Sequence, residues 1–100
     1  MGQLYYDSSH AVGIDDRALA HLQTVVIDKL RRAESFAWTF EDGERELTVW
    51  VSSATPLQFV YAGNRRPVLN RAWLESLALV ASSTDGLRLV PEPDEATVVA

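Results

Sequence analysis

Apolar residues recur every three or four positions in two segments of the chain, and this spacing places them on one face of a helix. These positions are Leu19, Leu22, Val26 and Leu30 in the first segment, and Trp73, Leu77, Val80 and Ala81 in the second. Asp15 and Asn70 precede the two segments, and both are residue types that cap helix N-termini. We therefore predict one helix over about residues 16–33 and a second that follows Asn70 and ends before residues 82–86.

Apolar and polar residues alternate in the segments around these helices, and a period of two is typical of strands. The clearest alternation lies on both sides of Asp42-Gly43, which predicts a hairpin. Shorter runs predict strands at residues 3–6, 10–14, 57–63 and 86–90.

The order of these elements is ββ-α-βββ-α-β, and its short connections favour antiparallel pairing. We therefore predict an α+β fold in which a mostly antiparallel sheet carries both helices on one face. One domain is expected over residues 1–90, followed by an acidic, proline-containing tail over residues 91–100. The last four residues, TVVA, are suited to pair with a sheet edge of this chain or of a neighbouring one.

The alternation also predicts the two faces of the sheet. The side that faces the helices is expected to carry Phe36, Trp38, Phe40, Leu47, Val49, Val51, Leu57, Phe59 and Tyr61. The opposite face carries the apolar Trp50 and Val60, together with Tyr5, among polar residues such as Thr39. Two interpretations stay open for this face: it is the scattered apolar surface of an antiparallel sheet with one wet side, or it is the interface of a homodimer.

The composition narrows the classes of protein without naming a function. Apolar residues make up 47% and charged residues 23%, which is ordinary for a soluble globular domain. The net charge of −5 argues against general nucleic-acid binding, because contacts to phosphates supply most of that affinity. No apolar run approaches the ~18 residues of a membrane span, and the N-terminus lacks the features of a signal peptide. We expect a cytoplasmic protein without a membrane partner.

Catalytic and metal-binding patterns are missing from the sequence. It contains no cysteine, and its two histidines, His10 and His21, lack metal-ligand spacing. His21 is interpreted as an ordinary residue at a helix boundary. No serine has the GxSxG frame, and the glycines form no phosphate-binding loop. We therefore expect neither an enzyme nor a bound cofactor or metal.

One stretch, YAGNRRPVLNRAW, has residues suited to binding an anion. Arg65 and Arg66 lie shortly before the predicted cap Asn70, and Arg71 follows it. A helix N-terminus carries partial positive charge and free N–H groups, so these four residues are a candidate site for a carboxylate, a phosphate or a protein partner. The alternative is that the arginines pair with acids such as Glu75 or keep the connection solvated.

Three segments also resemble a known group of proteins. DDRALAHLQTVVIDKLRRAESFAWTFED, LNRAWLESL and GLRLVPEP are similar to small single-domain proteins that are common in actinobacteria. The resemblance covers nearly the whole chain and implies a family without an established function, of which some members carry the label ATP-dependent DNA ligase. An adenylating ligase needs a nucleophilic lysine, usually in a KxDG motif. The only lysine here is Lys29, and none lies two residues before Asp42 or Asp85.

Two functions therefore remain open. The first is a small non-enzymatic binding or interaction domain that self-associates and has an unidentified protein or anion partner. The second is a DNA-associated accessory module, not a catalytic ligase, that uses the basic residues Lys29, Arg31, Arg32, Arg65, Arg66 and Arg71. The second requires the end of the first helix to lie beside the start of the second.

Overall fold

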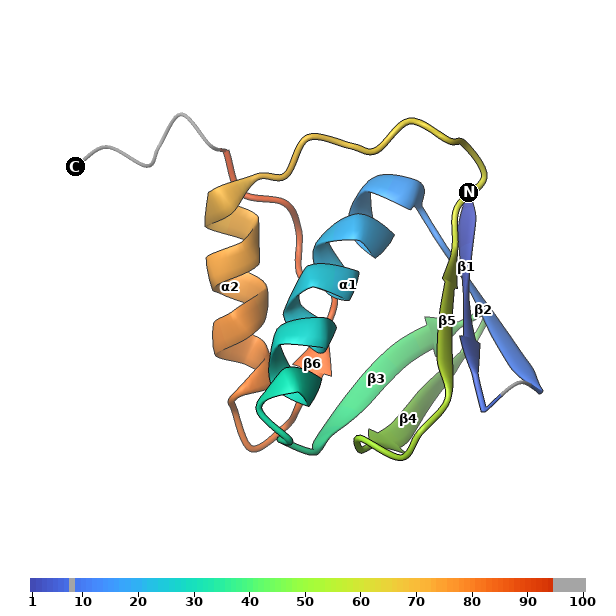
Figure 1. Cartoon of the computed structure of the whole chain (residues 1–100), viewed down its shortest axis with the longest axis vertical. Coiled ribbons are helices and arrows are strands. Elements are labelled where there is room, and N and C mark those ends of the chain that lie inside the picture. Colours follow the sequence, from blue (N-terminus) through green and yellow to red (C-terminus); the bar gives the residue numbers. More distant parts are fainter. Residues whose placement is uncertain (8, 95–100) are drawn as a thin grey trace.

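The computed structural model describes residues 1–7 and 9–94, and its elements follow the predicted order (Figure 1). They are β1 (Gly2–Tyr6), β2 (His10–Ile14), α1 (Asp16–Arg31), β3 (Phe36–Asp42), β4 (Arg45–Val51), β5 (Leu57–Val60), α2 (Arg71–Ala81) and β6 (Leu87–Arg88). The α+β class is thus confirmed. The predicted pairing of TVVA lies outside the described residues. Within them, none of the helices is long and apolar enough to cross a membrane.

The strands form two sheets where the sequence pattern predicted one. β2, β1 and β5 pair antiparallel in that order, and β3 pairs antiparallel with β4 and parallel with β6. The division occurs after β4, where Ser52 and Thr55 form a turn and Pro56 follows. Because proline has no N–H to donate to a ladder, β5 does not continue the hairpin and instead pairs with β1. The hydroxyl of Tyr6 donates to the carbonyl oxygen of Trp50 (3.0 Å) and joins the two sheets.

Both helices are capped as predicted. The carboxylate of Asp15 accepts hydrogen bonds from the N–H groups of Arg17 and Ala18. The side chain of Asn70 accepts from Ala72 and Trp73. Each cap satisfies N–H groups that the first turn of a helix leaves without partners.

The apolar faces meet in one core between the helices and the two sheets. Of the side chains predicted to face the helices, all except Leu47 belong to this core or pack against it. Its largest fully buried members are Trp38, Leu4, Leu19, Leu22, Leu77 and Leu87. Thr39 is buried although it was predicted to face outward, and its hydroxyl lies 2.8 Å from that of Thr48.

The two helices begin at the same end of the molecule and run in the same direction (Figure 1). The end of α1 lies beside the end of α2, since the ammonium group of Lys29 donates to the hydroxyl of Ser82 (3.2 Å). This direction follows from the path of the chain after β5. β5 runs along β1 toward the end where α1 begins, and residues 61–70 then cross to the start of α2 (Figure 1).

Candidate functional site

The connection between β5 and α2, residues 61–70, is held at its start by the first residue of α1. The two carboxylate oxygens of Asp16 accept hydrogen bonds from the N–H groups of Ala62 (3.1 Å) and Gly63 (3.2 Å). The hydrogen bond from Ala62 holds the pKa of Asp16 below its usual value. The connection, called here the 61–70 loop, therefore begins at a fixed position against α1.

The end of the 61–70 loop is held by residues in the first two turns of α1. The guanidinium of Arg17 donates to the carbonyl oxygen of Val68 (2.8 Å), and the N–H of Asn70 donates to Nε2 of His21 (2.7 Å). Because Nε2 accepts, Nδ1 carries the proton and donates to the carbonyl oxygen of Arg17 (2.7 Å). The loop is therefore anchored to α1 at both ends.

His21 is a core residue, whereas the sequence suggested an ordinary residue at a helix boundary. Its side chain is fully buried, and its ring lies 4.5 Å from that of Trp73, centroid to centroid. The correction has a simple cause: α2 begins directly against the second turn of α1. This contact between distant segments buries a position that its own helix would leave at the surface.

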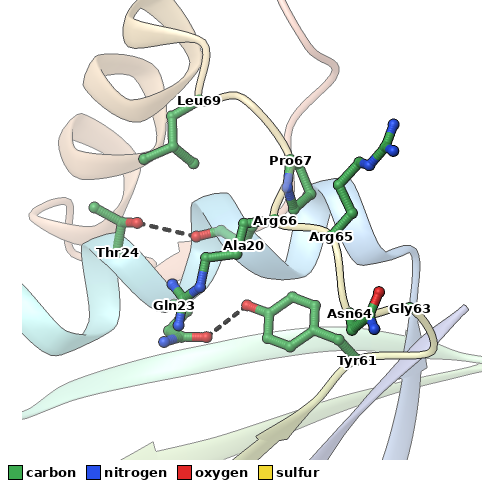
Figure 2. Close-up of a pocket in the computed structure, with 10 residues that line it drawn as sticks. All are labelled: Ala20, Gln23, Thr24, Tyr61, Gly63, Asn64, Arg65, Arg66, Pro67 and Leu69. Atoms are coloured by element: carbon green, nitrogen blue, oxygen red, sulfur yellow. Dashed lines mark hydrogen bonds between the residues drawn. The ribbon is translucent and has the colours of Figure 1, made fainter.

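A pocket of about 200 Å³ lies between α1 and the 61–70 loop. Its lining comprises Ala20, Gln23, Thr24, Tyr61, Gly63, Asn64, Arg65, Arg66, Pro67 and Leu69. Figure 2 shows that Arg66 reaches back toward α1, on the side that carries Gln23, whereas Arg65 points away from the pocket. The hydroxyl of Tyr61 donates to Oε1 of Gln23 and joins the strand side of the pocket to the helix (Figure 2).

The lining of this pocket is cationic in an acidic protein. It contains two arginines and neither an aspartate nor a glutamate, although the chain has 14 acidic residues and nine basic ones. Among the described residues, Arg65 and Arg66 form neither an ion pair nor a side-chain hydrogen bond. Burial raises the pKa of Tyr61, against the opposing effect of the Arg66 charge. The phenol therefore stays protonated and able to donate at neutral pH.

The other two predicted anion-binding residues do not line this pocket. Arg71 is the first residue of α2, is exposed, and lies 3.7 Å from the carboxylate of Glu75, which is the pairing that the sequence offered as the alternative. Asn70 is buried and holds the N–H groups of the first turn. The structure thus brings Arg65 and Arg66 to a pocket and places Asn70 and Arg71 at the helix start beside it.

A carboxylate of the chain itself, that of Glu92, lies at the start of α2. Arg17 donates to its two oxygens through Nε (2.9 Å) and Nη2 (2.7 Å), and Asn70 donates to it through Nδ2 (2.9 Å). The hydrogen bonds from Arg17 and then from Asn70 lower the pKa of Glu92 to about 2. Sequence reasoning missed this residue, because Glu92 was assigned to the tail. The available signal was its position between Pro91 and Pro93, which restrict the backbone.

The basic residues of the DNA-associated alternative are not brought together. Lys29 is buried near the end of α1 and lies 3.1 Å from the carboxylate of Glu34, and Arg32 pairs with Asp28 at 2.7 Å. These residues and Arg31 lie at the opposite end of the helices from Arg71 (Figure 1). The separation arises because the helices run in the same direction.

The candidate interface residues belong to different sheets. Trp50 lies on β4, at the edge of its sheet, and its side chain is 63% exposed. Val60 on β5 is 45% exposed, and Tyr5 on β1 is half-buried. Val60 and Tyr5 share one face, because Gln3 pairs with Val60 and lies two residues from Tyr5.

A second pocket, of about 290 Å³, opens between β2 and β3. Apolar core side chains such as Val12, Ile14 and Phe40 form much of its wall. Its one arginine, Arg88, pairs with Glu46 (3.4 Å). This pocket therefore lacks an arginine without an ion-pair partner, which is the feature that distinguishes the pocket beneath the 61–70 loop.

Elsewhere in the described part of the chain, no three His, Asp or Glu side chains gather closely enough to hold a metal ion. Comparison with the curated proteins and with the solved structures found no match. The family model described as a domain of unknown function, DUF7882, matches residues 1–92. The match includes Glu92 and every residue of the pocket beneath the 61–70 loop. The chain therefore belongs to the DUF7882 family, whose function is unknown.

Proposed function

We propose that this chain is a non-catalytic binding domain and that its ligand is an anion held by Arg66 in the pocket beneath the 61–70 loop. The observation that carries the proposal is the direction of Arg66, which points into a pocket whose lining contains no carboxylate (Figure 2). An arginine without a partner beside a cavity attracts an anion through charge-assisted hydrogen bonds. The anchored ends of the loop hold it in place before a ligand arrives, which lowers the entropic cost of binding.

The lining also supports binding over catalysis. Its ionisable groups are Arg65, Arg66 and Tyr61. General acid–base catalysis favours a group whose pKa lies near the operating pH. Arginine stays charged at all ordinary pH values, and burial raises the pKa of Tyr61 further from neutrality. The pocket is therefore suited to hold an anion rather than to transfer a proton.

The direct test measures anion binding with two matched arginine variants. Titration calorimetry with acetate, phosphate and sulfate, at constant ionic strength, would be run on the wild type, Arg66→Gln and Arg65→Gln. We expect binding of at least one anion that is lost in Arg66→Gln and retained in Arg65→Gln, because only Arg66 points inward. Equal binding by all three proteins would show that the pocket is not the site, and absence of binding by the wild type would contradict the proposal.

A second proposal, self-association, rests on Trp50. A tryptophan that is 63% exposed on an edge strand presents apolar surface at the edge of a sheet, and this favours association. Light scattering after size exclusion, at micromolar protein concentration, should show a dimer in the wild type and a monomer in Trp50→Thr. A wild type that is monomeric at all concentrations would exclude this proposal.

The DNA-associated module remains the alternative, and its residues lie at two separate ends of the helices. Because phosphate contacts dominate such binding and weaken with salt, a gel shift at about 50 mM salt is the sensitive condition. Absence of a shift there would remove this alternative. In each of these proposals the domain acts in the cytoplasm.

A further inference from the structure

We infer that the anion bound beneath the 61–70 loop is a small organic monocarboxylate with a short apolar group. This inference rests on the proposed function and specifies the class of its ligand. The pocket, at about 200 Å³, is smaller than the roughly 300–1,000 Å³ of sites that enclose drug-sized ligands. A nucleotide therefore exceeds its size, whereas a small acid does not.

The donors in the pocket match a single planar carboxylate. The guanidinium of Arg66 is a planar fork of N–H groups, which pairs with the two oxygens of a carboxylate. Gln23 supplies a neutral donor beside it. Because Oε1 of Gln23 accepts the hydroxyl hydrogen of Tyr61, its NH₂ group is oriented away from that bond and keeps two hydrogens to donate. Tyr61 thus acts as a positioning residue for the amide.

Several backbone donors beside the pocket, at the start of the 61–70 loop and of α2, are already occupied. Phosphate sites bind their ligand through the N–H groups of a helix N-terminus or a tight loop. Here the N–H groups of Ala62 and Gly63 donate to Asp16. Those at the start of α2 donate to the Asn70 side chain. The negative charge of Asp16 at this side of the loop further disfavours a dianion, so the chemistry fits one negative charge rather than two.

The remaining wall of the pocket is apolar. Ala20 contributes from α1, and Pro67 and Leu69 contribute from the 61–70 loop (Figure 2). Leu69 is 41% exposed, so part of its surface is available to a ligand. Burial of apolar surface stabilises a complex, which favours a branched or aromatic acid over acetate.

The test is a titration of the ¹⁵N-labelled protein, followed by amide chemical shifts, at constant ionic strength. The probes are isobutyrate, its neutral amide isobutyramide, acetate and inorganic phosphate. We expect isobutyrate to shift amides of residues 61–69 and of α1 near Gln23, with affinity above that of acetate. Arg66→Gln should weaken isobutyrate binding by about tenfold or more, and Arg31→Gln, at the far end of α1 and outside the pocket, should leave it unchanged. Arg66→Lys, which keeps the charge without the fork, should lie between them.

The outcomes separate this inference from the proposed function. Phosphate binding that depends on Arg66, without isobutyrate binding, would overturn the monocarboxylate class and keep the anion pocket. Equal affinity for isobutyramide and isobutyrate would overturn both, because charge would then contribute nothing. No shift with any probe would also overturn both. If Tyr61→Phe, with Arg66 intact, no longer prefers isobutyrate to isobutyramide, this result would support the positioning role of Tyr61.

Discussion

Glu92 lies against Arg17 through two parallel N–H···O contacts of 2.9 and 2.7 Å, although the two residues are 75 positions apart in the chain. The same guanidinium donates to the carbonyl oxygen of Val68, in the 61–70 loop. Arg17 therefore links the segment after β6 to the loop that forms the pocket. The indole N–H of Trp73, which donates to Val90 (2.9 Å), holds that segment from the side of α2.

The first prediction concerns pH and Glu92. Its pKa of about 2 in the folded protein lies below the ordinary value of 4.5, so folding favours the charged carboxylate. The resulting stabilisation is fully present above about pH 4.5 and is lost as the pH falls toward 2. We expect Glu92→Gln to have a lower Tm than the wild type at pH 6, and the difference to shrink as the pH falls.

Thermal unfolding followed by circular dichroism between pH 2 and pH 7 measures this difference. Glu75→Gln is the matched control, because Glu75 forms an exposed pair with Arg71 on the surface of α2, and such pairs contribute little. A constant difference between Glu92→Gln and the wild type across this range would contradict the assignment of the effect to ionisation.

The second prediction concerns His21. Replacing it with leucine fills the buried position with an apolar side chain but leaves the N–H of Asn70 without its acceptor. An unsatisfied buried donor costs about 1–3 kcal/mol, and we expect a loss of stability of this size in urea unfolding. Thr24→Ala on the exposed side of the same helix is the control, with an expected change within about 0.5 kcal/mol. Equal stability of His21→Leu and the wild type would show that this bond contributes nothing.

The parts of the fold that the sequence predicted depend on near neighbours. The caps Asp15 and Asn70 act on N–H groups two or three residues away, and the hairpin around Gly43 pairs segments that adjoin it. The division into two sheets depends instead on the pairing of β5 with β1, and α2 runs parallel to α1 as a consequence. The alternation within a strand does not identify the strand with which it pairs. The sequence pattern therefore could not predict the order of the strands or the relative direction of the helices.

The candidate site was predictable in the same limited sense. Charge near a helix start identified Arg65 and Arg66, but their backbone neighbours do not determine that Arg66 points inward and Arg65 outward. Gln23 lies on α1 at an unremarkable polar position and forms part of the pocket only because the 61–70 loop crosses it. The contribution of Glu92 likewise depends on contact with Arg17 across the whole chain.

The third prediction compares two glycines with positive φ. A Cβ built on Gly86 (φ +84°) would clash with the carbonyl oxygen of Ala37, whereas one on Gly43 (φ +67°) would meet nothing within 4 Å. Alanine at either position is strained by about 1–2 kcal/mol. Only Gly86→Ala must also displace β3, which lies in the core, so we expect it to be clearly more destabilising than Gly43→Ala in urea unfolding. Equal losses would mean that β6 moves away without cost.

The fourth prediction is a stabilising change at the end of α1. Ala33 has φ +57°, and its N–H and that of Glu34 donate to the carbonyl oxygens of Leu30 and Lys29. This is a Schellman motif, in which glycine is the usual residue at the position of Ala33. Ala33→Gly should raise stability by about 0.5–1 kcal/mol, because it relieves left-handed strain of about 1–2 kcal/mol at some entropic cost. An unchanged or lower midpoint in urea would contradict this account.

The fifth prediction separates a structural role of Arg66 from a binding role. Within the described residues Arg66 forms no ion pair or side-chain hydrogen bond, and it is exposed. Arg66→Gln should therefore change the free energy of unfolding by less than about 0.5 kcal/mol while it weakens anion binding. Arg17→Gln should, in contrast, clearly lower the free energy of unfolding, because it removes the partner of Glu92 and an anchor of the loop. Urea unfolding of both variants without added ligand measures this contrast. A large loss of stability in Arg66→Gln would show that its side chain supports the fold, and its direction toward α1 would then have a structural cause.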